Sequence, residues 1–170
     1  MKTRFSPQHL HRSAKSTFGD FVCLRCRRFV SAEPVLSGVQ NRNHCPYCLS
    51  SRHLDLYEPG DRLSACKALM RPIGLTLKKS AKKYLQPGQG EMMLIHLCDD
   101  CGKVSINRLA ADDFSEAILE IFETSQRLDA RAKSQLATNS IIALQNADRA
   151  LVYMRLFGRN QAFGSPIFLK

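Results

Sequence analysis

Apolar positions divide the chain into a strand-rich first part and a helical last part. Phe21-Val22-Cys23 and Phe29-Val30 are typical of two short strands on either side of a turn. Met92–Leu97 is a longer apolar run that predicts a third strand. The preceding segment Thr76–Lys83 is the expected partner of this strand in a hairpin, with the Pro- and Gly-containing segment Gln86–Gly90 at its tip.

The apolar spacing becomes helical after Asn107. Asp112 and Asp113 can cap a helix whose apolar face contains Phe114, Ile118, Ile121 and Phe122. A second helical stretch is predicted over Thr138–Phe157, with Gly158 as its C-cap and one apolar face formed by Ile141, Leu144, Ala147, Leu151 and Met154. The simplest arrangement is a helical hairpin packed on the first part of the chain or on itself.

Two segments between the expected strands are less regular. Residues 33–43 contain Pro, Gly and Asn at turn positions and predict a loop. Leu63–Leu69 is interpreted as a helical turn that ends before Pro72.

The composition allows a folded core and excludes wholesale disorder. The chain has 170 residues, 44% of them hydrophobic, and a net charge of +10. Residues 1–110 carry 18 Lys and Arg against 8 Asp and Glu, whereas residues 111–170 carry 7 against 7. All the net charge therefore falls on the first part, which favours a polyanionic partner such as nucleic acid. The alternative is a basic surface that has no partner.

Three Cys-x-x-Cys pairs carry the strongest chemical signal in the chain. They begin at Cys23, Cys45 and Cys98, and eighteen residues separate Cys26 from Cys45. This spacing is typical of four-thiolate zinc sites, because two turns can each offer two sulfurs to one tetrahedral ion. Such a turn is called a knuckle below.

Seven cysteines and the histidines allow two tetrahedral sites, and the sequence leaves their division open. The simplest division places Cys23, Cys26, Cys45 and Cys48 on one zinc ion and His53, Cys66, Cys98 and Cys101 on a second. His44 and His96 compete with His53 for the last position. In the alternative division, Cys45, Cys48, His53 and Cys66 form one site, and Cys23, Cys26, Cys98 and Cys101 form the other.

Several features favour thiolates in a reducing compartment. Residues 1–20 lack the apolar stretch of a signal peptide, and the cysteine count is odd, so a cytoplasmic protein is expected. No apolar run is long enough to cross a membrane. Residues 1–19 are predicted to be a flexible basic arm, with an organellar transit peptide as the alternative.

Catalytic readings of the same cysteines are weaker. Cys45-Pro46-Tyr47-Cys48 matches the glutaredoxin active-site tetrapeptide, but a turn at Pro59-Gly60 follows too soon for the long helix that this chemistry needs. Rubredoxin also uses a Cys-Pro-x-Cys turn, so iron is an alternative metal for the first site. A zinc hydrolase would need an open coordination position, with Asp55, Glu58 or Asp61 as its base. No catalytic residue is therefore assigned.

Basic residues around the knuckles favour nucleic-acid binding over catalysis, with RNA as the expected partner and binding of DNA left open. Rigid turns would hold these side chains in place, and the ring of Tyr47 could stack on a base. The candidate phosphate contacts are Arg25, Arg27, Arg28, Arg42, Arg52, Lys78, Lys79, Lys82 and Lys83.

The string Asn41–Leu49 resembles the signature of the RNHCP-domain family, which is named for residues seen here as Arg42–Pro46. Blocks at Ser51–Asp55, Pro59–Arg62, Leu69–Ile73 and Ile95–Asp113 are also similar, so the resemblance covers about residues 21–113. It implies small cytoplasmic bacterial proteins with zinc sites. The family pattern includes His53, Cys66 and His96, which strengthens the expectation of a second metal site.

Two positions depart from this family pattern. Arg27 stands where the family usually has glycine, and Lys67-Ala68 replaces a pair of glycines. The first change adds positive charge beside the first knuckle, and the second argues against a role that needs bare backbone there.

The sequence therefore predicts an α+β protein with a zinc-ribbon-like antiparallel module and a C-terminal helical hairpin. The expected divisions are residues 1–19, 20–113 and 114–170, and the loss of zinc should unfold the module. The first functional hypothesis is a non-catalytic RNA-binding protein that is associated with the ribosome. The second is a protein-interaction module that uses the C-terminal helices, and the third is a zinc enzyme or thiol oxidoreductase.

Overall fold

Two antiparallel sheets and three longer helices make up the part of the chain that the computed structural model describes, residues 19–58, 60–78 and 90–158. The observed order is β1 (Phe21–Val22), β2 (Phe29–Val30), α1 (Pro34–Ser37), β3 (Ser51–Arg52), β4 (Leu69–Lys78), β5 (Glu91–Cys98), β6 (Val104–Arg108), α2 (Ser115–Ser125), α3 (Ala130–Thr138), the 3-10 turn η1 (Asn146–Asp148) and α4 (Arg149–Phe157). The expectation of a mixed α+β fold with antiparallel sheets is confirmed.

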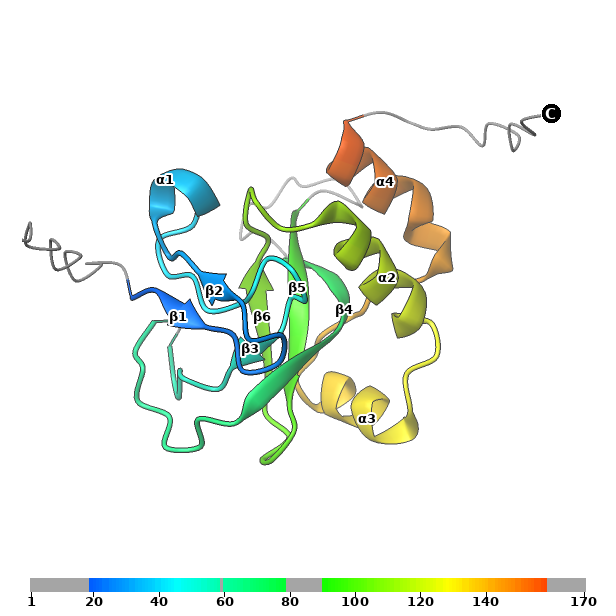
Figure 1. The fold of residues 1–170 in the computed structure, drawn as a ribbon. Helices are drawn as coiled ribbons and strands as arrows, with labels where there is room; N and C mark the ends of the chain where they lie inside the picture. Colours follow the sequence, from blue (N-terminus) through cyan, green and yellow to red (C-terminus); the bar gives the residue numbers. More distant parts are fainter. Residues whose placement is uncertain (1–18, 59, 79–89, 159–170) are drawn as a thin grey trace, which may run out of the picture.

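The larger sheet has the strand order β3-β4-β5-β6, and each neighbouring pair is antiparallel. The hairpin expected from the sequence is present in part, because β4 pairs with β5 from Met70–Cys98 to Lys78–Glu91. Only Thr76–Lys78 of the expected partner segment is seen to pair, and residues 79–89, which include most of the expected tip, lie outside the described residues. Figure 1 shows the small β1–β2 hairpin to the left of this sheet and α2, α3 and α4 to its right.

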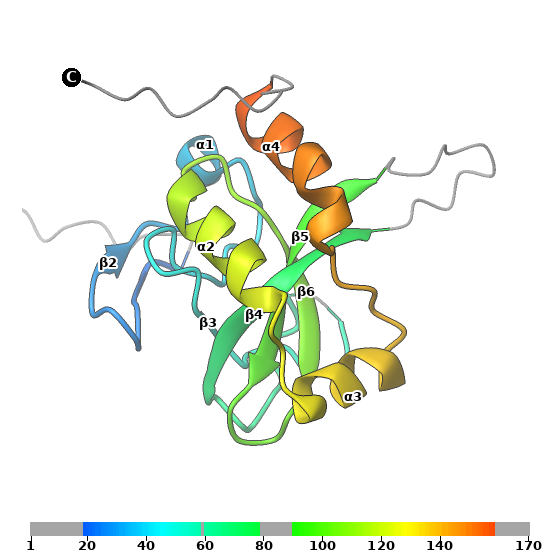
Figure 2. The same ribbon diagram turned by 90° about the vertical axis from the view of Figure 1, so that its right-hand side faces the viewer.

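Helix α2 covers the sheet closely because of a glycine in β4. A Cβ atom at Gly74 would lie 3.3 Å from the Cβ of Ser125, at the end of α2. The register of β4 and β5 shifts between Pro72 and Gly74, where Pro72 cannot donate a backbone hydrogen bond. The bulge and the bare backbone together let the helix approach the strand, as seen from the side in Figure 2.

The main apolar core joins the sheet, the second knuckle and the helices. It contains Leu49 from the knuckle, Leu75, Met92 and Leu94 from the sheet, and Ile118, Phe122, Leu144 and Val152 from the segments after residue 113. Residues on both sides of the expected boundary at residue 113 therefore share one core, and the division of the chain at that position stays a prediction.

The structure differs from the expected helix over Thr138–Phe157. Helix α3 ends at Thr138 and α4 begins only at Arg149, so a helical hairpin is not clearly formed. The intervening segment runs along β4 instead: the Leu144 amide donates to the Leu75 carbonyl at 2.8 Å, and the Thr76 hydroxyl donates to the Ile142 carbonyl at 2.7 Å. Hydrogen bonds to the strand edge have outweighed the helical spacing of the apolar residues.

The expected helical turn over Leu63–Leu69 is also absent. The segment is irregular as far as Ala68, and Leu69 already begins β4. Within the loop expected over residues 33–43, Pro34–Ser37 forms one short helical turn. None of the helices in the described ranges is long and apolar enough to span a bilayer.

Replacing Phe122 by Ala should lower the free energy of unfolding by about 3–5 kcal/mol, because this ring is fully buried between the helix and the sheet. Urea unfolding of the zinc-loaded protein measures the change. Ile142→Ala is the control, because this exposed side chain should contribute less than about 0.5 kcal/mol. An effect of Phe122→Ala as small as that of the control would show that α2 is not part of the folding core.

Candidate metal centres

All three Cys-x-x-Cys pairs form the same backbone turn. In each, the amide of the first cysteine donates to the carbonyl five residues later, and the amide four residues later donates to the carbonyl of that cysteine. These pairs are Cys23 to Arg28 and Arg27 to Cys23, Cys45 to Ser50 and Leu49 to Cys45, and Cys98 to Lys103 and Gly102 to Cys98. The repeated bonds place both sulfurs of a pair on the same side of the turn.

The fifth residue of every knuckle is left-handed. The φ angles are +62° at Arg27, +55° at Leu49 and +73° at Gly102. Only glycine adopts this conformation without steric cost. Arg27 thus occupies a strained backbone position, and so does Lys67 with a φ of +54°.

The first cluster brings together Cys23, Cys26, Cys45 and Cys48, whose sulfurs all lie within 4.8 Å of one another. Two of the sulfur pairs, Cys23–Cys48 and Cys26–Cys45, are separated by 3.6 and 3.5 Å. Burial raises the pKa of the Cys45 thiol and of the Cys23 thiol. Ionising these buried groups therefore needs a compensating cation, which a metal ion supplies.

The second cluster brings together His53, Cys66, Cys98 and Cys101 within the same limit of 4.8 Å. The sulfurs of Cys66 and Cys98 are 3.6 Å apart, and the Cys101 sulfur lies 3.3 Å from Nδ1 of His53. Burial, together with the nearby Lys103, lowers the pKa of His53. The imidazole is thus held neutral, which is the form that binds metal.

Both donor sets fit zinc. Two sulfurs bound at about 2.3 Å to one tetrahedral ion lie roughly 3.8 Å apart, close to the separations observed here. Four protein donors complete each coordination shell, as in structural zinc sites. The bound ions would hold the knuckles together, and the protein can take two of them, as expected from the sequence.

The structure decides how the cysteines divide. The alternative division, which joined Cys45 and Cys48 to His53 and Cys66, is wrong, because the first two lie with Cys23 and Cys26. The competing histidines face other partners. His44 Nε2 lies 2.8 Å from Asp113, and His96 Nε2 donates to the Leu49 carbonyl at 2.7 Å.

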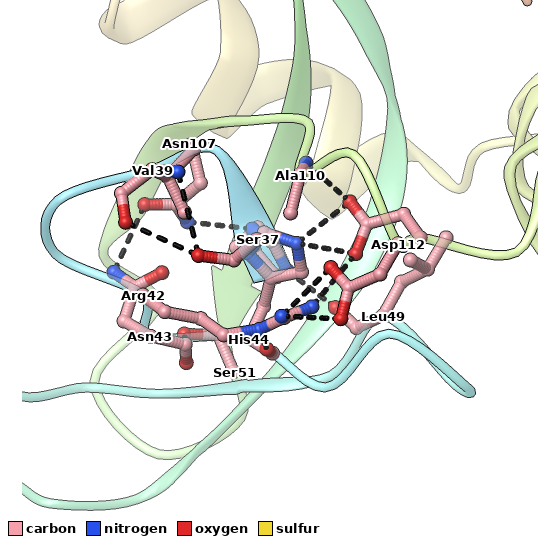
Figure 3. A network of polar contacts seen from close by, with 12 residues as sticks. Ser37, Val39, Arg42, Asn43, His44, Leu49, Ser51, Asn107, Ala110 and Asp112 are labelled. Carbon is pink, nitrogen blue, oxygen red and sulfur yellow. Dashed lines mark hydrogen bonds and ion pairs between the residues drawn. The ribbon is translucent and has the colours of Figure 1, made fainter. Parts of the chain in front are cut away.

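An ion-pair network lies beside the second knuckle (Figure 3). The guanidinium of Arg42 donates to Asp112 at 2.7 Å and to Asp113 at 3.2 Å, and its Nε donates to the His44 carbonyl. Asp113 also accepts the Ala110 amide at 2.7 Å. The network therefore joins the segment before the knuckle to the segment before α2.

A second chain of hydrogen bonds crosses from the knuckle to the sheet. His96 donates to Leu49 through Nε2, so its Nδ1 accepts the amide group of Asn107, and the side-chain oxygen of Asn107 accepts from Asn43. Burial and then the neighbouring His44 lower the pKa of His96 to about 3. His96 is thus a neutral structural residue that links β5 to the knuckle.

Arg42, one of the candidate RNA contacts, is buried and is not available for RNA. Its side chain has an exposed fraction of 0% and both carboxylates occupy its guanidinium, so it cannot reach a phosphate. Arg25, Arg27, Arg28, Arg52 and Lys78 are exposed. Lys79, Lys82 and Lys83 lie outside the described residues.

Tyr47 has local partners, whereas Phe29 is open. The Tyr47 ring contacts Phe114 edge-on at 5.1 Å, and the guanidinium of Arg28 lies 4.5 Å from its centroid. Phe29 is 63% exposed beside the exposed Val22 on the adjacent strand. Phe29 was not among the candidate contacts expected from the sequence. The signal was present, because neighbouring side chains of a strand point to opposite faces, so either Phe29 or Val30 had to face outward.

Two of the carboxylates considered as bases, Asp55 and Asp61, bind the backbone of the loop that joins His53 to Cys66. Asp61 accepts the amides of Glu58, Leu63, Leu56 and Tyr57, and these bonds hold its pKa well below the usual range. Asp55 accepts the amides of Gly60 and Arg62. Both side chains thus organise the backbone of this loop.

Comparison with known families agrees with the motif. The family model described as the RNHCP domain matches residues 18–119. No curated protein and no solved structure gives a significant match to the chain.

Replacing Arg42 by Leu should lower the free energy of unfolding by about 3–5 kcal/mol, because it leaves the Asp113 carboxylate buried without its cation. Chemical unfolding at constant zinc measures this loss. Arg71→Leu is the matched control, since its ion pair with Asp99 is exposed and contributes less than about 1 kcal/mol. Equal effects of the two variants would contradict a structural role for Arg42.

The left-handed knuckle positions predict opposite effects of glycine. Arg27→Gly should raise stability by about 1 kcal/mol by relieving backbone strain. Leu49→Gly should lower stability by about 2–5 kcal/mol, because its side chain is fully buried in the core. Thermal unfolding of both zinc-loaded variants distinguishes them, and a destabilised Arg27→Gly protein would refute the strain argument.

Proposed function

Since the chain belongs to the RNHCP domain family and its two clusters fit zinc, we propose that it is a zinc-stabilised protein that binds RNA at the ribosome, in the cytoplasm. One observation carries the proposal. Arg25, Arg27 and Arg28 project from the first knuckle, are exposed, and have no ion pair with a carboxylate in the described part of the chain.

Three arginines elsewhere in the fold contrast with these three, because each has an acidic partner. Arg71, Arg108 and Arg149 each form an ion pair, with Asp99, Glu91 and Glu123 respectively. The first knuckle thus carries three neighbouring exposed cations without an acidic partner, on a backbone that a zinc site would hold rigid. Rigid cations lose little conformational entropy when they bind phosphates, and RNA carries one phosphate per nucleotide.

Phe29 adds a stacking surface to these cations. Its exposed ring follows directly after Arg28, and Val22 lies opposite it on β1. Proteins that bind single-stranded RNA combine basic side chains with exposed aromatic rings in this way. Lys78, at the end of β4, is a further exposed basic residue.

A protein-interaction module is the second candidate. Met154 and Phe157 on α4 are 41% and 45% exposed, although Val152 of the same helix is buried in the core. These two apolar side chains could contact a partner protein. Changing both to Ser should then abolish recovery of that partner and leave RNA binding intact.

Replacing Arg25, Arg27 and Arg28 by Gln should weaken RNA binding by at least about tenfold at moderate salt. The salt dependence of the binding constant should flatten by about 2, since each phosphate contact with a single strand contributes about 0.7 to the slope. Binding of the full-length zinc-loaded protein to ribosomal RNA, measured at several salt concentrations, gives both quantities.

A triple Gln variant at the three paired arginines, Arg71, Arg108 and Arg149, is the matched control. It loses the same three charges, but each of them already has an acidic partner. This control should keep nearly the original salt slope. Equal losses in the two triple variants would mean that only the net charge matters, and the proposed contact surface would be wrong.

A further inference from the structure

Two cavities adjoin β3, the short strand between the first knuckle and the long strands (Figure 1). The first, the knuckle cavity, has a volume of about 100 Å³ and is lined by Cys23, Leu24, Ser50 and Arg62, among others. The second, the sheet cavity, has a volume of about 210 Å³ and is lined by His53, Met70, Lys103 and Ile106, among others. Asn43, Arg52 and Leu54 line both, so the two cavities share a wall.

Each cavity has a buried polar group without a partner. The Ser50 hydroxyl and the His53 Nε2 have no hydrogen-bond partner in the described part of the protein. Ser50 is 2% exposed and lines the knuckle cavity, and His53 is 4% exposed and lines the sheet cavity. Buried polar groups are normally paired, so each marks a place where a polar ligand atom would be stabilised.

The proton positions follow from the metal site. Nδ1 of His53 faces Cys101 in the second cluster, where it would bind the metal without a proton. Nε2 therefore carries the ring proton and can donate a hydrogen bond to a ligand in the sheet cavity. The hydroxyl of Ser50 can donate or accept. The sheet cavity therefore favours a ligand with a carbonyl-type acceptor, whereas the knuckle cavity accepts either polarity.

Cations border both cavities. Arg52 lies in the shared wall, and its described hydrogen bond, from Nε to the Lys67 carbonyl, leaves the rest of the guanidinium available. Arg62, which is paired with Asp55, borders the knuckle cavity. Lys103 borders the sheet cavity together with the carboxylates of Asp55 and Glu58, which leaves Arg52 as the cation shared by the two cavities. Apolar walls, one unpaired polar group per cavity and a cation between the cavities fit two flat heteroaromatic rings joined by an anionic link.

We propose that the two cavities take the bases of two neighbouring nucleotides of single-stranded RNA, with Arg52 at the phosphate between them. This inference rests on the proposed RNA-binding function and specifies the form of its ligand. Paired bases in a duplex cannot enter a cavity, whereas bases of a loop or a free end can. Cys23, a ligand of the first cluster, lines the knuckle cavity, and His53, a ligand of the second, lines the sheet cavity. Bound zinc would therefore also hold the walls of both cavities in place.

The test compares an unstructured single-stranded RNA of about ten nucleotides with the same strand in a duplex, on the full-length zinc-loaded protein. The single strand should bind at least about tenfold more tightly, since each stacked base contributes enough for such a difference. Arg52→Gln should reduce that affinity about tenfold and leave duplex binding unchanged.

Two further variants test the cavities themselves. Ser50→Ala removes the unpaired hydroxyl, and Ser105→Leu fills part of the sheet cavity, where the Ser105 hydroxyl has only a weak contact with the Met70 sulfur at 3.9 Å. Each should weaken single-strand binding by about threefold or more. Arg71→Gln changes a residue of β4 that lines neither cavity and should have no effect. Zinc content and thermal unfolding show that each variant is folded.

The outcomes separate the two proposals. If the Arg25, Arg27 and Arg28 variant loses RNA binding but the Arg52, Ser50 and Ser105 variants do not, the proposed function stands and the cavity inference is overturned. Equal binding of single strand and duplex also overturns the cavity inference alone. If the unmodified protein binds neither RNA, both proposals fail.

Discussion

The buried guanidinium of Arg42 determines how the segment before the second knuckle meets the segment before α2. A cation without exposed surface is stable only beside a counter-charge, and here Asp112 and Asp113 supply two. These carboxylates lie directly before α2, so their contact with Arg42 fixes where the helix starts. The Asp113 carboxylate also contacts Nε2 of His44 and accepts a hydrogen bond from the Ala110 amide. The arginine and histidine of the family motif are therefore structural residues.

Leu49 connects the metal site to the apolar core. Its left-handed backbone closes the second knuckle, and its side chain packs in the core. Its carbonyl accepts a hydrogen bond from Nε2 of His96. A change in the geometry of the first cluster is therefore transmitted directly to β5. Glycine would occupy this position with less strain, but the core contact of the Leu49 side chain outweighs the backbone cost.

The sequence predicted the features that depend on local spacing. The Cys-x-x-Cys pairs, the β4–β5 hairpin and the helix after Asp113 follow from residues close in the chain. It did not predict the burial of Arg42, whose acidic partners are 70 positions away or more. Ile141 and Leu144 have helical spacing, but the segment that contains them runs along β4, and their side chains pack on the core from there and not from a helix. The cavities beside β3 also depend on distant segments, which spacing does not reveal.

The two clusters differ in the chain length that each must enclose. In the first, Cys23 and Cys48 are 25 positions apart and come from adjacent turns. In the second, His53 and Cys101 are 48 positions apart, and Cys98 takes its place only when β5 has paired with β4. Closing the longer loop costs more entropy and requires the sheet. The ions should therefore be acquired in chain order: the nascent chain can gather the first four sulfurs early, and the second ion fastens a sheet that has already formed.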